Sequence, residues 1–179
     1  SGAVSDLSVD DPIGSRYFAV GSAQSASNGP VVALLRAPLE RILPAGHNLF
    51  VAFDNASIGT TVCAQIYVVG GMGFSGSVLD ALGTGTGTTA AQLSATMPSA
   101  AVPELAFAAF ASDAAIGAVQ APATGLGSVC AGGVCLNSAY YFSGTAGSAG
   151  VAYSGGGQTV WAGVVGAVYA DDIFGNGFN

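Results

Sequence analysis

The residue pattern most suggestive of chemistry is a glycine motif. Gly71, Gly73 and Gly76 form G-x-G-x-x-G directly after the apolar run QIYVV. This spacing is that of the loop that holds a dinucleotide pyrophosphate between a strand and a helix. Such a site also needs a second parallel strand that ends in an acidic residue about 20 residues further on, whereas this chain continues into GTGTGTTAAQ. In a chain with 28 glycines the motif arises easily by chance. We therefore expect a hairpin or bulged loop here and no nucleotide cofactor.

Side chains for acid–base, nucleophilic or metal chemistry are scarce. His47, the only histidine, lies in the turn sequence PAGHNL, and no serine stands in a G-x-S-x-G elbow. The pairs Asp10–Asp11 and Asp171–Asp172 are each adjacent in sequence, so in an extended chain their carboxylates point to opposite sides. Together the two pairs offer oxygens to Ca²⁺, but no D-x-D-x-D spacing supports a calcium loop and no Cys/His set has zinc spacing. We predict no enzyme, no metal site and no cofactor.

The three cysteines predict a disulfide bond. In VCAGGVC, Cys130 and Cys135 bracket two glycines and lie close enough for a small-loop disulfide. One alternative pairs either of them with Cys63, and another leaves three reduced thiols. We expect the Cys130–Cys135 disulfide, with Cys63 outside it, and this pairing favours an oxidising compartment.

Aromatic residues offer a candidate ligand surface. Tyr140, Tyr141 and Tyr153 cluster late in the chain, and Trp161 is the only tryptophan. Exposed members of this group would stack on the rings of a neutral polysaccharide. The competing interpretation is that they are core residues of alternating strands, which is the commoner case.

Charge excludes several partner classes. Of 179 residues only 7% are charged, against about 25% in an ordinary soluble domain. The net charge is −7, with three arginines and no lysine, so we expect no nucleic-acid partner and no docking on anionic lipid. A surface rich in Gly, Ser, Thr and Ala suits a protein that contacts other copies of itself or a neutral polymer. The start SGAVSD, without an initiator Met, fits a mature secreted protein whose signal peptide has been removed.

The elements that must position these residues are predicted to be strands. Short β-rich runs alternate with Gly, Ser, Pro and Asn, which is typical of an all-β antiparallel sandwich. The predicted strands are RYFAVGS, VVALLR, HNLFVAF, TVCAQIYVV, LSATM, ELAFAAFA, AYYFSG, GVAYSG and TVWAGVVGAVYA, whereas LGTGTGTTAAQ and SGTAGSAG are predicted loops. In 61–69 the alternation places Cys63 on the more polar face, and therefore within reach from outside. For 104–118 we favour a strand, with one short helix as the alternative.

The run Val160–Ala170 contains no charge and stops at two aspartates. Eleven residues are too few for a membrane-spanning helix, which needs about 20. Trp161, Val165 and Ala167 alternate with Val160, Val164 and Val168, so both faces of a strand would be apolar. This pattern indicates a strand covered on both sides and no membrane insertion.

The end of the chain carries a resemblance over about twenty residues. TVWAGVVGAVYA resembles the closing strand of secreted bacterial jelly-roll domains, and DDIFGNGFN is similar to the I-F-x-x-G-F-E tail of some secreted Gram-negative proteins, with Asn in place of the final Glu. The resemblance implies secretion and a jelly-roll-like β-sandwich, and it carries no activity.

We therefore expect one β-sandwich domain over 1–170 and a C-terminal docking tail over 171–179, anchored by Ile173, Phe174 and Phe178. The predicted function is that of a secreted, extracellular or cell-surface structural protein. It would be a homo-oligomer or polymer, such as a filament or surface-layer subunit, that associates through strand edges or terminal segments. The alternative is a carbohydrate- or surface-binding module.

Overall fold

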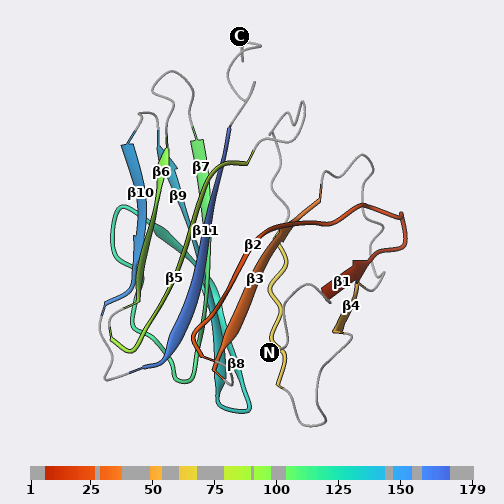
Figure 1. Ribbon diagram of the computed structural model, residues 1–179, viewed down its shortest axis with the longest axis horizontal. Coiled ribbons are helices and arrows are strands. Elements are labelled where there is room, and N and C mark those ends of the chain that lie inside the picture. The colour runs from red at the N-terminus through yellow and green to blue at the C-terminus, as the bar shows by residue number, and fades with distance from the viewer. Residues whose placement is uncertain are drawn as a thin grey trace.

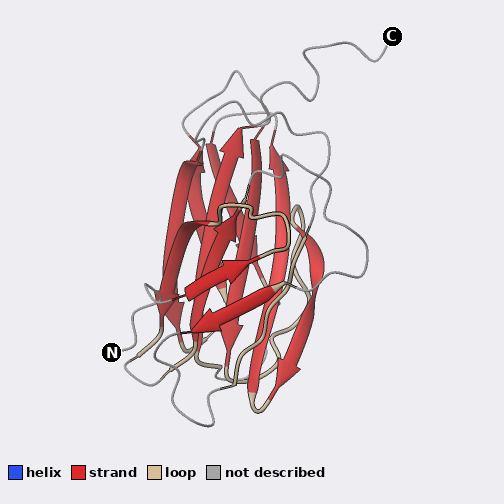
Figure 2. Cartoon of the chain, turned by 90° about the vertical axis from the view of Figure 1, so that its right-hand side faces the viewer, coloured by secondary structure: helices blue, strands red, loops and turns tan. Residues whose placement is uncertain are grey.

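The computed structural model describes residues 7–26, 29–37, 49–53, 61–67, 79–89, 91–97, 104–143, 147–154 and 159–169. These parts are all-β, and their strands run antiparallel to their neighbours (Figures 1 and 2). The strands are β1 (Leu7–Asp10), β2 (Phe18–Gln24), β3 (Val31–Arg36), β4 (Phe50–Phe53), β5 (Leu79–Gly87), β6 (Gln92–Met97), β7 (Glu104–Ser112), β8 (Thr124–Ala131), β9 (Val134–Ser143), β10 (Gly147–Ala152) and β11 (Trp161–Tyr169). The predicted all-β antiparallel class is confirmed.

A five-stranded sheet in the order β5-β11-β7-β9-β8 forms the centre of the fold. The pair β2–β3 packs on one face of this sheet, and the pair β6–β10 packs on the other. We call these the β2 face and the β6 face. Figure 1 shows β2 and β3 crossing the sheet close to β11, while β6 and β10 lie beside one another on the far side of β5. The layers are consistent with a sandwich; the jelly-roll connectivity stays a prediction.

The strand β11 has apolar residues on both faces, as its sequence predicts. Residues 161–168 are all buried. Trp161, Val165 and Ala167 belong to the core cluster under β6 and β10, together with Phe110. Val164 belongs to the second cluster, under β2 and β3. A central strand packed on both faces needs apolar residues at successive positions, which explains the uninterrupted run.

Residues Glu104–Ser112 form strand β7, so the predicted strand is confirmed and the helical alternative is wrong for them. Their alanines favour a helix in isolation. However, β7 pairs with β11 on one side and with β9 on the other along its whole length. The two ladders and the packing in both core clusters stabilise the extended conformation, and they outweigh the helical preference of the alanines.

Two segments predicted to be loops contain strands. Residues 82–87 of the predicted loop LGTGTGTTAAQ lie in β5, which pairs with β11, and residues 147–150 of the predicted loop SGTAGSAG lie in β10, which pairs with β6. Glycine weakens a strand because it has no side chain to pack. Here one glycine has a specific use, because a Cβ at Gly87 would lie 2.7 Å from Nε1 of the Trp161 indole. The bare backbone of Gly87 is the surface on which the indole packs.

Candidate interaction site at the disulfide hairpin

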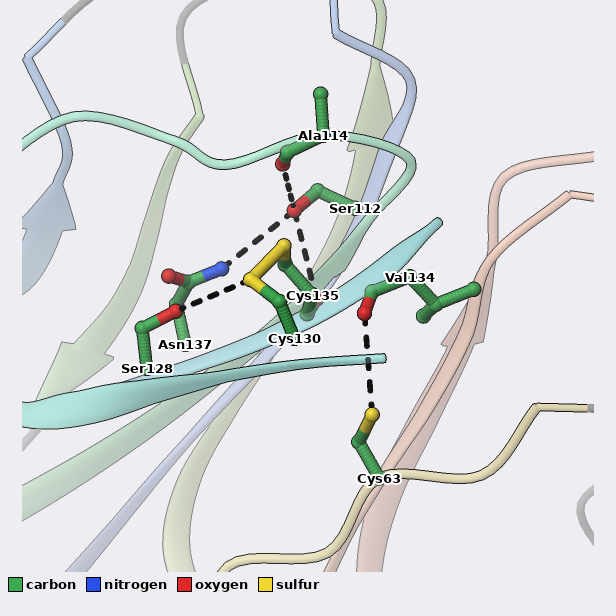
Figure 3. Close-up of a disulfide and its surroundings, with 8 residues drawn as sticks. All are labelled: Cys63, Ser112, Ala114, Ser128, Cys130, Val134, Cys135 and Asn137. Carbon is green, nitrogen blue, oxygen red and sulfur yellow. Dashed lines mark hydrogen bonds between the residues drawn. A yellow bond between two sulfur atoms is a disulfide. The ribbon is translucent and has the colours of Figure 1, made fainter. Parts of the chain in front are cut away.

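The hairpin formed by β8 and β9 is closed by a turn and a disulfide. Ala131 pairs with Val134 across Gly132 and Gly133, whose φ angles are 53° and 80°. Two positive φ angles in a two-residue turn are those of a type I′ hairpin, which glycine adopts without strain. Cys130 and Cys135 are the next pair along the ladder, with Cα atoms 4.1 Å apart, and they form the disulfide (Figure 3). The predicted Cys130–Cys135 pairing is confirmed.

Strand β8 forms one edge of the five-stranded sheet. Seven of its eight residues are exposed, all except Leu126. A bulge interrupts its pairing between Gly125 and Gly127, after which the ladder with β9 is regular to Ala131. Proteins commonly protect such an edge with charges, with proline or with a bulge. Here the bulge protects only the first half of the strand, and Thr124–Ala131 contains no charged residue and no proline.

The main-chain groups of β8 alternate between β9 and the open edge. In an antiparallel ladder, hydrogen-bonded pairs alternate with pairs that exchange no bonds. The pair that flanks a two-residue turn, Ala131 and Val134, is hydrogen-bonded. By alternation Val129 also bonds to β9, whereas the N–H and C=O groups of Ser128 and Cys130 point away from it. The open edge therefore presents donors and acceptors at two alternate residues.

An extended segment, Thr61–Tyr67, crosses the β2 face of this hairpin. We call it the strap. Gln65 and Tyr67 bind Ser138 of β9: the Ser138 hydroxyl donates to Gln65 Oε1 at 2.8 Å, and it therefore accepts from the Tyr67 hydroxyl at 2.7 Å. The Tyr67 hydroxyl also lies 3.2 Å from the carbonyl oxygen of Leu126, at the bulge of β8. The strap thus follows the β2 face of the hairpin from the bulge of β8 to the turn at Gly132, and Ser128–Ala131 of β8 remain exposed.

The strap was predicted as a strand, but Thr61–Tyr67 is an extended segment outside the strands of the fold. Its side chains alternate as predicted, but its orientation reverses one prediction. Its polar side faces the sheet, and the Cys63 thiol is half-buried and donates to the carbonyl oxygen of Val134 at 3.8 Å (Figure 3). The expectation that Cys63 faces outward is therefore wrong. The reason is the buried Ser138 on β9, which needs polar partners in the strap. As a result Val62 and Ile66 point outward and are 44% and 57% exposed.

The four aromatic residues considered for ligand stacking do not form one exposed surface. Tyr153 and Trp161 are 6% and 5% exposed. Both pack against Phe110, with ring centroids 5.3 Å and 5.6 Å apart. Tyr140 and Tyr141 are half-buried, and as neighbours on β9 they lie on opposite faces of the sheet. Tyr153 and Trp161 are core residues, so these two side chains are not available to stack on a ligand at the surface.

Several candidate residues lie outside the described parts. They are the glycine motif at 71–76, His47, the pair Asp171–Asp172, the tail anchors Ile173, Phe174 and Phe178, and the boundary between 170 and 171. Within the described ranges no three His, Cys, Asp or Glu residues gather as metal ligands would. Those ranges also contain no helix long and apolar enough to span a membrane.

Asp11, one of the carboxylates considered for calcium, organises a turn. Its Oδ1 accepts hydrogen bonds from the main-chain N–H groups of Ile13 and Ser15, and its Oδ2 accepts one from the Tyr17 hydroxyl at 2.8 Å. Desolvation opposes ionisation, but a hydrogen bond from the Ser15 side chain and the three above outweigh it and lower the pKa of Asp11 to about 2. The carboxylate is thus engaged within its own loop.

We expect an NMR titration to give Asp11 a pKa near 2, and the substitution Tyr17→Phe to raise it because one donor is removed. A folded-state pKa below the ordinary 3.8 makes Asp11 stabilising above that pH, and this contribution is lost as the pH falls toward 2. As a control, Tyr141→Phe removes a hydroxyl elsewhere and should leave the titration unchanged. An ordinary pKa for Asp11 in the wild type would contradict this account of the loop.

The disulfide should stabilise the fold modestly, because it closes a loop with a sequence separation of only 5. The double substitution Cys130→Ala/Cys135→Ala should lower the free energy of unfolding by about 2 kcal/mol in the chain-entropy model, as measured by urea denaturation. The control Cys63→Ser should cost less than about 0.5 kcal/mol. Non-reducing peptide mapping that linked Cys63 to either partner would contradict the pairing.

No protein-family model, no curated protein and no solved structure matches the chain.

Proposed function

We propose that the protein is a secreted structural subunit that self-associates through the open edges of its five-stranded sheet. The observation that carries this proposal is the regular half of β8. It is exposed, it contains no charge, and by its register with β9 it directs main-chain donors and acceptors of Ser128 and Cys130 outward. A strand with these properties is a template for pairing with another strand.

Exposed apolar side chains on the same side of the molecule support the proposal. By register with Leu136, Val129 lies on the β2 face, and it is 42% exposed. Phe142 pairs with Leu105 of β7 and is 46% exposed. The outward side chains of the strap, Val62 and Ile66, lie over this face. A partner that covered these groups would remove apolar area from water, which is the main favourable term in most protein association.

An extracellular location fits the chemistry of the chain. The Cys130–Cys135 disulfide is typical of oxidising compartments. Because only 7% of the residues are charged, a contact between copies removes few charged groups from water. In this proposal the tail anchors Ile173, Phe174 and Phe178 add a second contact, docked on a neighbouring subunit.

The proposal is tested by the mass of the native protein. We expect light scattering coupled to size exclusion to show a mass that rises with concentration, and negative-stain images to show regular oligomers or polymers. A monomer at every concentration that is retained on a neutral polysaccharide matrix would reject self-association and favour a carbohydrate-binding module. A monomer that is not retained would reject both functions.

A further inference from the structure

The number of strands in the central sheet restricts how copies join. Neighbouring strands in the order β5-β11-β7-β9-β8 are antiparallel, so the two edge strands, β5 and β8, point in the same direction. Copies related by translation would therefore meet in a parallel β8–β5 pair. Copies related by a two-fold axis would instead meet as an antiparallel β8–β8 or β5–β5 pair. The two-fold arrangement continues the antiparallel pattern, which is the slightly more stable pairing.

Of the two edges, β8 is the better suited to pairing with itself. In a two-fold interface a charged residue near the axis meets its own copy. Strand β5 carries Asp80, whereas β8 carries no charge. In addition, β5 contacts β2 and β6, which pack on opposite faces of the sheet, whereas β8 makes extensive strand contacts only with β9 among the described strands.

The direction of the main-chain groups, together with the bulge and the turn that bound the regular stretch, fixes the register. Ser128 and Cys130 direct their N–H and C=O groups outward, so they must form the hydrogen-bonded pairs with the partner strand. An axis at Ser128 would carry the pairing into the bulge, and an axis at Cys130 would carry it into the turn, so Ser128 of one copy faces Cys130 of the other. This register places Val129 opposite its own copy, on the axis. Neither the bulge at Gly125–Gly127 nor the turn at Gly132–Gly133 lies within the paired stretch.

We propose that β8 is a homodimer edge, in which two copies pair antiparallel around a two-fold axis through Val129. The inference rests on the proposed self-association and names its contact. A two-fold interface is closed, so β8 alone gives a dimer. A longer assembly then needs a second contact, such as the β5 edge or the tail.

The test is site-directed cross-linking in the Cys63→Ser background. Residues that face one another without exchanging hydrogen bonds are about 4.5 Å apart at Cα, which is within disulfide range. Val129→Cys should give a disulfide-linked dimer as the main product under mild oxidation by oxidised glutathione, with a 129–129 link found by peptide mapping. Thr124→Cys, exposed on the same strand but before the bulge, should remain uncross-linked.

A second pair of variants is independent of cysteine chemistry. Val129→Lys places two like charges opposite one another and should raise the dissociation constant of the dimer by roughly fivefold or more in sedimentation velocity. Val129→Thr, which keeps a β-branched uncharged side chain, should change it less than Val129→Lys does. Both variants should remain folded because Val129 is 42% exposed.

The outcomes separate this inference from the proposed function. If the protein associates but Val129→Cys gives no 129–129 link and Val129→Lys leaves association intact, the β8 edge is wrong while self-association stands. Equal cross-linking at Thr124→Cys would also overturn the register. If the wild type never associates, the proposed function fails and the β8 dimer fails with it.

Discussion

The substitution Trp161→Ala should lower the free energy of unfolding by about 3–5 kcal/mol, the range for truncating a large buried aromatic side chain. Trp161 is 5% exposed and lies between Gly87 and Ser112 in a cross-strand row that continues to Cys135. Its indole also packs at 5.6 Å from the ring of Phe110, which is fully buried. The other members of this cluster are mainly alanines, which are too small to fill the space left by an indole.

Urea denaturation of the wild type and two variants measures this effect. Phe18→Ala is the matched control, because Phe18 is an aromatic residue of a strand that is 47% exposed. Its removal should cost much less than that of Trp161, because much of its surface is already in water. Similar losses for the two variants would mean that Trp161 is not the core anchor that its burial indicates.

The substitution Gly87→Ala should destabilise the wild type by about 1–3 kcal/mol, the typical cost of overpacking a filled site. The added Cβ would lie 2.7–2.8 Å from three atoms of the Trp161 indole, a rigid group that has to move as a whole. In a strand the same substitution would otherwise be favourable, because glycine loses more conformational freedom on folding than alanine.

A double-mutant cycle isolates this contact. In the Trp161→Ala background the indole is absent, so Gly87→Ala should cost little or become stabilising, and the two substitutions should be strongly non-additive. Gly150→Ala is the control, because its Cβ would meet nothing within 4 Å. Additive effects of Gly87→Ala and Trp161→Ala would show that the glycine is not there to receive the indole.

Sequence reasoning succeeded where residue chemistry and local pattern agree. The run at Val160–Ala170 predicts a strand covered on both faces, and residues 161–168 of β11 are buried on both. Cysteines on either side of Gly-Gly predict the hairpin disulfide, because the turn brings the two residues into register. In these cases the determining contacts are local or follow directly from alternation.

The strands that sequence reasoning missed owe their structure to distant partners. Strand β5 reads as a flexible Gly–Thr repeat, but it pairs with β11 and lies against Trp161, about 75 residues further along the chain. Strand β8 was not predicted, because its glycines and small residues lack β propensity. The Gly132–Gly133 turn is the sequence signal that predicts β8. A two-residue hairpin turn followed by a strand requires a second strand directly before the turn.

The orientation of the strap shows a second limit. Alternation correctly separates Cys63 and Gln65 from Val62 and Ile66, but it does not say which side faces the protein. The buried hydroxyl of Ser138 on β9 decides this, by binding Gln65 and Tyr67. Because that partner lies 71 residues or more away in the chain, its influence is not visible in the strap's own sequence.

Amide hydrogen exchange at single-residue resolution tests the central claim most directly, namely that the protein associates through its sheet edge. At a dilution that keeps the chain monomeric, we predict slow exchange at Val129 and Ala131, which bond to β9, and fast exchange at Ser128 and Cys130. On association, Ser128 and Cys130 should gain about tenfold protection or more, while Val129 and Ala131 stay protected. Association that leaves the Ser128 and Cys130 amides in fast exchange would contradict the account.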